Sequence, residues 1–114
     1  MKDNVKKYLY DILVSAESIF EYLGEQRDFN DYCNNKLLRR AVEREFEIIG
    51  EAMNKLLKLN KNIKIENAKR IINLRNFVIH GYDKVDNTII WGIISRDLVQ
   101  LKDEVEELLN KTKA

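Results

Sequence analysis

The sequence predicts an all-α fold in which amphipathic helices form a bundle. Apolar residues recur at steps of three and four over most of the 114 residues, as they do on the buried face of a helix. The chain has no proline and only four glycines, so it contains few residues that interrupt a helix. Apolar residues make up 45% of the chain and charged residues 34%, which suits helices with one buried and one solvated face. We therefore expect a single helical domain over residues 1–114 with one core.

The first predicted helix covers residues 3–23, where apolar side chains keep the helical spacing without a break. Gly24 follows directly and can end the helix, because glycine adopts the left-handed conformation of a helix C-terminus without steric cost. Residues 25–35 are polar and irregular. We expect a short turn here, in which Phe29 and Tyr32 pack toward the core.

The second predicted helix begins after Asn34 or Asn35, either of which can cap it, and extends to about Leu59. Gly50 lies inside this helix, where glycine costs about 1 kcal/mol relative to alanine. Its position beside the small residue Ala52 favours a close crossing with another helix over a break.

Two further helices complete the predicted bundle. The third begins at Glu66 or Asn67 and continues to residue 80, where Gly81 can end it. Residues 86–88 offer caps for the fourth, which then follows an apolar repeat to about residue 110.

The composition excludes several classes of protein. A single cysteine, Cys33, rules out an internal disulfide, and one cysteine with one histidine cannot build a typical zinc site. No run approaches the roughly 18 apolar residues of a membrane span. The N-terminus becomes a charged amphipathic stretch rather than the apolar run of a signal peptide. We expect a cytoplasmic protein with no membrane contact, no metal and no cofactor.

Charge is distributed unevenly, although the net charge is only +1. Residues 55–75 contain seven basic side chains and one acid, whereas residues 103–107 contain four acids. Solvated helix faces are the ordinary explanation of both runs. The alternative is that the basic run binds the backbone of a nucleic acid with little sequence preference. The candidate RNA-binding residues are Lys58, Lys61, Lys64, Lys69 and Arg70.

Arg75 has an unusual position on the third helix. At 100° per residue it falls in the middle of the apolar arc, where an unpaired guanidinium is costly to bury. It therefore either extends from the edge of the core, pairs with a carboxylate such as Glu47 or Glu51, or reaches a cleft. The opposite side of the helix carries a polar stripe formed by Lys69, Asn73, Asn76 and His80.

The only histidine, His80, lies five residues after this arginine and two before Tyr82. A histidine at a helix end can simply interact with the last carbonyl groups. It can also act as an acid or base near neutral pH. The residues around it leave both explanations open.

Residues 75–82, which read Arg-Asn-Phe-Val-Ile-His-Gly-Tyr, resemble the R-x-x-x-x-H-x-Y signature of HEPN domains, and specifically of the HepT-like toxins. A polar residue often follows the arginine in that superfamily, and Asn76 fits. Residues 47–52 resemble the family's E-x-I-G-E-A segment, and an A-V-x-R pattern precedes them at residues 41–44. The region of Trp91 also fits the family.

The resemblance implies a four- to five-helix up-and-down HEPN bundle that usually forms a homodimer. It implies a metal-independent endoribonuclease, the toxin of a toxin–antitoxin pair. The partner would be a small MntA-like nucleotidyltransferase that silences the toxin by transferring AMP to the motif tyrosine, here Tyr82. The catalytic residues would be Arg75 at the scissile phosphate, His80 as acid or base, and Asn76 as an orienting group.

On a regular helix, Arg75 and His80 lie about 140° apart and do not converge on one atom within a chain. Either the helix unwinds near its end, or two copies of the motif meet across a dimer axis. We favour the dimeric cleft, which also supplies two histidines for separate acid and base roles. The rival hypothesis is a non-catalytic helical module that dimerises and docks a nucleotidyltransferase.

Overall fold

The computed structural model describes residues 3–25, 27–66, 68–79 and 87–111, and for residues 3 and 74–79 it describes the backbone alone. The elements are α1 (Asp3–Leu23), α2 (Phe29–Asn34), α3 (Lys36–Leu59), α4 (Ala68–Ile79), α5 (Asn87–Gly92), the π-helical segment η1 (Ile93–Asp97) and α6 (Leu98–Lys111). These ranges contain helices and no strand, which confirms the predicted all-α bundle.

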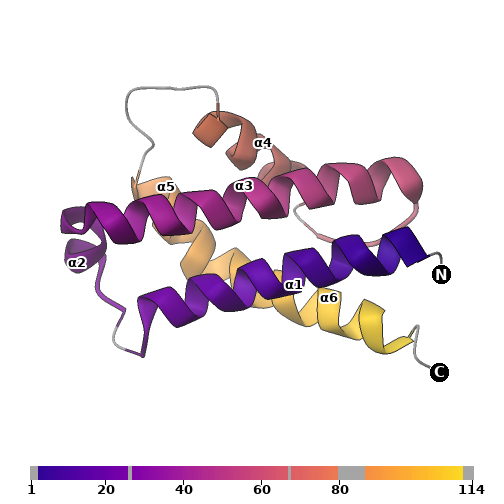
Figure 1. Cartoon of the computed structure of the whole chain (residues 1–114), viewed down its shortest axis with the longest axis horizontal. Coiled ribbons are helices and arrows are strands. Elements are labelled where there is room, and N and C mark those ends of the chain that lie inside the picture. Colours follow the sequence, from indigo (N-terminus) through magenta and orange to yellow (C-terminus); the bar gives the residue numbers. More distant parts are fainter. Residues whose placement is uncertain (1–2, 26, 67, 80–86, 112–114) are drawn as a thin grey trace.

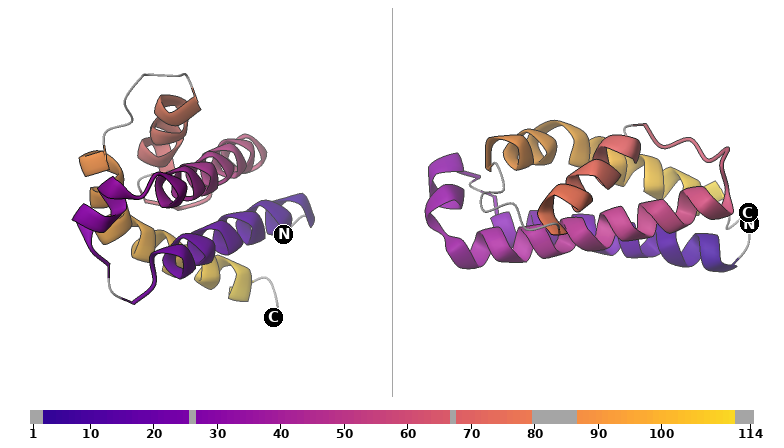
Figure 2. Two further views of the ribbon diagram at one scale, coloured as in Figure 1. Left: turned by 60° about the vertical axis from the view of Figure 1, so that its left-hand side comes forward. Right: turned by 90° about the horizontal axis from the view of Figure 1, so that it is seen from above.

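Helices α1 and α3 form a long antiparallel pair that is the frame of the molecule (Figure 1). Helix α6 packs against α1, and the shorter α4 packs against α3. In the left-hand view of Figure 2, α4 lies above α3 and α1 lies below it, so the two pack on different sides of α3. The motif-bearing helix is therefore held chiefly by α3.

Local sequence signals fix the ends of the first helices as predicted. Gly24 follows α1 with φ at +70°, and its N–H donates to the carbonyl oxygen of Phe20 at 3.1 Å. Asn35, rather than Asn34, caps α3: its side-chain oxygen accepts from the N–H of Leu38 at 3.0 Å. The left-handed glycine and the asparagine cap thus set the boundaries of the frame.

The segment between α1 and α3 contains more structure than the expected turn. Residues 29–34 form the short helix α2, in which Tyr32 is fully buried. The Tyr32 ring lies 5.4 Å from the ring of Trp91, and the Phe29 ring lies 5.8 Å from it, measured between centroids. Packing of Tyr32 toward the core is confirmed, whereas Phe29 remains partly exposed.

The fourth predicted helix is one helical run over residues 87–111, but a π-helical turn interrupts it. Two buried residues, Ile93 and Leu98, lie five positions apart, a step that a regular α-helix would turn away from the core. In the structure the N–H of Leu98 donates to the carbonyl oxygen of Ile93, the i→i+5 bond of a π-helix. The wider turn brings both side chains to the buried face.

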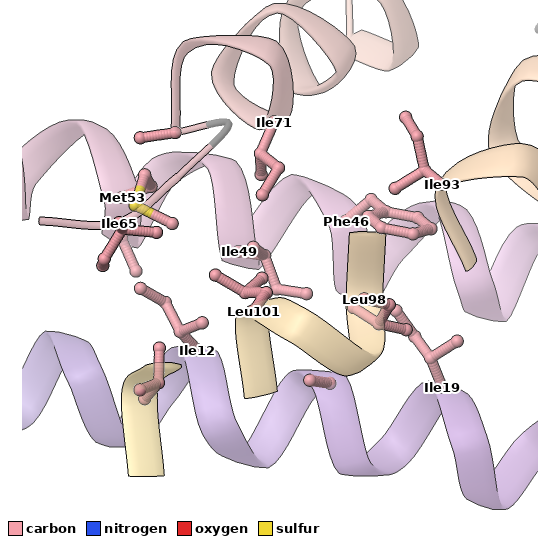
Figure 3. Close-up of a cluster of buried hydrophobic side chains, with 14 of the residues drawn as sticks. Ile12, Ile19, Phe46, Ile49, Met53, Ile65, Ile71, Ile93, Leu98 and Leu101 are labelled. Atoms are coloured by element: carbon pink, nitrogen blue, oxygen red, sulfur yellow. The ribbon is translucent and has the colours of Figure 1, made fainter. Parts of the chain in front are cut away.

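The core lies between α1, α3 and the C-terminal helical run, and Ile71 extends it to α4 (Figure 3). Among its largest members, each less than 2% exposed, are Leu9, Ile12, Phe46, Ile49, Met53 and Leu98.

Candidate active site

Helix α4 has the two faces that its sequence predicts, as far as its side chains are described. Ala68 and Ile71 are buried, at 8% and 2% exposure, and Ile71 points toward the α3 residues Ile49 and Met53 (Figure 3). Lys69 and Asn73, two members of the predicted polar stripe, are exposed. The first half of α4 is therefore oriented as expected.

Two of the predicted catalytic residues lie further along the same helix. The backbone of Arg75 and Asn76 lies in the last two turns of α4, which ends at Ile79. The side chains of Arg75 and Asn76 lie outside what the structure describes, as do His80 and Tyr82 altogether. Whether the arginine and the histidine converge within one chain thus remains a prediction.

Both carboxylates considered as partners of Arg75 have other cations beside them. Glu47 on α3 accepts from the guanidinium of Arg44 at 3.1 Å, and Glu51 lies 3.1 Å from the ammonium of Lys55. These pairs join neighbouring turns of the same helix; the Lys55–Glu51 pair is exposed, whereas Glu47 is partly buried. Both carboxylates therefore carry nearby positive charge from α3 itself.

Three polar contacts attach the N-terminal end of α4 to the C-terminal helical run. The backbone N–H of Glu66, just before α4, donates to Oε2 of Glu104 at 3.0 Å. The side-chain amide of Gln100 donates to Oε2 of Glu66 at 2.6 Å. In the first turn of α4, the guanidinium of Arg70 lies 3.4 Å from Oδ2 of Asp97, an ion pair without hydrogen-bond geometry.

These contacts place the beginning of α4 relative to α6, while the apolar face of α4 packs on α3. Asp97 ends the π-helical turn, and Gln100 and Glu104 follow on α6 at steps of three and four. The wider π-helical turn therefore helps set the direction in which these three side chains point toward Glu66 and Arg70. Sequence reasoning missed this attachment: Glu104 belongs to an acidic run interpreted as solvated, yet it is only partly exposed. No local signal links residue 104 to residue 66.

The predicted RNA-binding residues lie along the connection from α3 to α4. Lys58 occupies the last turn of α3, Lys61 and Lys64 lie in the connector, and Lys69 lies in the first turn of α4. All four lysines are exposed and free to meet solvent or a ligand. Arg70 differs, because its half-exposed guanidinium faces Asp97, whose side chain is 11% exposed.

Within the described ranges, no group of three His, Cys, Asp or Glu side chains is arranged to hold a metal ion. None of the helices described is both long and apolar enough to cross a membrane.

Residues 12–108 match the family model described as HepT-like, Ribonuclease HepT-like. A "Putative RNase" of Methanocaldococcus jannaschii is 40% identical over 107 residues, which cover 92% of this chain and 96% of the relative. A "Putative RNase" of Caldanaerobacter subterraneus is 36% identical over 110 residues, which cover 95% of this chain and 96% of that relative. A "Probable ribonuclease HepT" of Thermococcus cleftensis is 35% identical over 109 residues, which cover 95% of this chain and 98% of that relative. No solved structure matches the chain.

Proposed function

Because the chain belongs to the HepT-like ribonuclease family, we propose that it is a metal-independent endoribonuclease, the toxin of a cytoplasmic toxin–antitoxin pair. The observation that carries this proposal is the family match, which spans residues 12–108 and so includes the whole motif at residues 75–82. The relatives' names, which specify an RNase or a ribonuclease, support RNA as the substrate.

The chemistry needs no metal, because RNA carries its own nucleophile. The ribose 2′-oxygen attacks the adjacent phosphorus as its proton passes to a base, and the bond from phosphorus to the 5′-oxygen breaks as an acid protonates that oxygen. His80 has an imidazole suited to either proton transfer near neutral pH. Arg75 would bind the non-bridging phosphate oxygens through its bidentate fork and stabilise their developing charge. Asn76 would orient the imidazole or a phosphate oxygen.

We further propose that two copies of the chain share the site. Arg75 and His80 are about 140° apart on a regular helix, so one chain alone does not aim both at one phosphate. A homodimer would supply two histidines, one as base and one as acid. Mixing Arg75→Ala protein with His80→Ala protein tests this: a shared site should recover part of the activity, and a mixture as inactive as its parents would exclude it.

Silencing by the MntA-like nucleotidyltransferase would follow from the proximity of Tyr82 to the site. AMP on its phenolic oxygen adds bulk and negative charge where the RNA phosphate must bind, so it repels the substrate. A Tyr82→Phe protein should resist this silencing while it retains cleavage. Full silencing of that variant by the partner would contradict silencing through Tyr82.

The cleavage assay that tests the proposed function compares purified wild-type protein with His80→Ala protein on RNA, with EDTA present and no metal added. Wild-type protein should cleave and His80→Ala protein should not. Cleavage that EDTA abolishes would overturn the metal-independent mechanism. Equal cleavage by both proteins would remove His80 from it.

A further inference from the structure

A groove between α1 and α3 is hollowed by two cavities that share the same aromatic side chain. One cavity, of about 190 Å³, is lined by residues that include Lys7, Tyr8, Glu51 and Lys55. The other, of about 280 Å³, is also lined by Tyr8 and Lys55, together with Lys58. For comparison, a cavity of about 150 Å³ accommodates benzene. Both cavities that Tyr8 lines are therefore large enough to hold a planar ring.

The groove brings cations to this ring. The ammonium of Lys7 lies 5.4 Å from the centroid of the Tyr8 ring, and that of Lys55 lies 5.8 Å from it. Both lysines also pair with a carboxylate one turn along their own helix, Lys7 with Asp11 at 3.7 Å and Lys55 with Glu51 at 3.1 Å. These pairs are exposed, so each contributes little to stability and can exchange its carboxylate for a phosphate.

The groove joins the basic stretch already described. Lys58 lines the second cavity and occupies the last turn of α3, where the lysines of the connector to α4 begin. Lys58 therefore belongs both to the second cavity and to the basic stretch that continues along the connector to α4. The groove is thus a continuation, away from the motif helix, of the proposed RNA-binding surface.

We propose that this groove is a subsite for single-stranded RNA, in which a base stacks on Tyr8 while Lys7, Lys55 and Lys58 bind the flanking phosphates. An aromatic ring between backbone-binding cations is the usual arrangement for sequence-tolerant binding of single strands. An acidic protein surface would use the lysines but has no need of the ring or of the cavities beside it. The inference rests on the proposed function, since it names where that substrate extends beyond the motif.

The test measures binding of an oligouridylate of about 12 nucleotides, within the range of single-strand binding sites. The protein carries His80→Ala, so that bound RNA is not cleaved. On this background, Tyr8→Leu removes the aromatic ring and keeps an apolar side chain against the core, whereas Tyr8→Phe keeps the ring. Tyr8→Leu should raise the Kd roughly 5- to 100-fold, the effect of losing one stacked base, and Tyr8→Phe should not.

The lysines supply an independent readout should Tyr8→Leu fail to fold. Replacing Lys55 by glutamine should weaken binding and reduce the slope of log K against log salt by about 0.7, because one phosphate contact is lost. Lys36→Gln, an exposed lysine at the other end of α3, is the matched control and should change neither. If both lysine variants lose the same amount of binding affinity, overall charge rather than a contact in the groove explains the loss, and the subsite is wrong.

Three further results test this inference separately from the proposed function. If wild-type protein cleaves RNA but Tyr8→Leu and Tyr8→Phe bind it equally, the groove is not a subsite and the ribonuclease remains. If polyglutamate of equal charge competes as well as RNA does, the groove binds anions in general and base stacking is wrong. Ring-dependent binding without cleavage by wild-type protein would instead keep the subsite and reject the nuclease.

Discussion

The hydroxyl group of Tyr32 gives the sharpest prediction about stability. This side chain is fully buried between α2, α3 and α5, and its Oη has no hydrogen-bond partner among the residues that the structure describes. Tyr32→Phe removes this oxygen and keeps the ring that packs against Trp91. We expect the variant to fold as well as wild-type protein or better.

The magnitude follows from the cost of an unpaired buried hydroxyl, about 1–3 kcal/mol. Part of this gain is lost because the void left by the oxygen reduces packing, so we expect the free energy of unfolding to rise by about 1 kcal/mol. In a domain of this size, such a change raises Tm by about 4 °C.

Urea denaturation at pH 7 measures this difference, with coincident circular dichroism and fluorescence transitions as the check that unfolding is two-state. The control is Tyr22→Phe. The Tyr22 hydroxyl is exposed and donates to Glu45 at 3.0 Å, so its loss should change stability by less than about 0.5 kcal/mol. If Tyr32→Phe loses 1 kcal/mol or more, the hydroxyl has a partner and the reasoning is refuted.

Three further predictions concern alkaline stability and the ends of two helices. Burial raises the pKa of Tyr32 above its usual value of 10.0, so folding stability does not depend on its titration below pH 10 and falls as the pH rises further, by up to about 1.4 kcal/mol per pH unit. Alkaline denaturation should therefore be shallower in Tyr32→Phe, and equal slopes would contradict the burial. Asn35→Ala should cost about 1 kcal/mol in denaturant titrations because it frees the N–H of Leu38, whereas Asn35→Ser should keep most of the cap. Glu104→Ala should speed amide exchange at Glu66 more than Glu104→Gln does, since the amide oxygen still accepts; identical rates would remove this attachment of α4.

Local signals in the sequence predict the frame of the molecule. Gly24 and Asn35 act through their own backbone and side chain on residues at most four positions away, so their roles are readable without a structure. The two faces of α4 follow in the same way from its helical period, as the burial of Ile71 and the exposure of Lys69 and Asn73 confirm. These features depend only on interactions between residues that are close in sequence.

The features that the sequence did not predict depend on tertiary packing. Leu98 follows Ile94 at an ordinary four-residue helical step, so the sequence gives no sign that Ile93 also shares its buried face, which takes a π-helical turn. The contact of Glu104 with Glu66 joins residues 38 positions apart. Neither has a local signature, and the second corrects the solvated interpretation of the acidic run at Glu104 alone.

The candidate site likewise has features that the sequence predicts and others that only tertiary packing creates. Its residue types, spacing and family are readable from residues 75–82 and 47–52, and the family match confirms the family. The groove beside Tyr8 was not predicted, because Lys7 and Lys55 come together only when α1 packs antiparallel to α3.

The central claim, that this chain cleaves RNA through the ribose 2′-oxygen without a metal, is tested most directly by one substrate change. A defined RNA that the wild-type protein cleaves in EDTA is prepared again with a single 2′-deoxy nucleotide on the 5′ side of the cut. The account predicts that cleavage at that position stops, while the unmodified RNA yields fragments with 2′,3′-cyclic phosphate ends. Cleavage of the 2′-deoxy substrate at the same position would contradict it, because a nucleophile other than the ribose hydroxyl would then attack the phosphate.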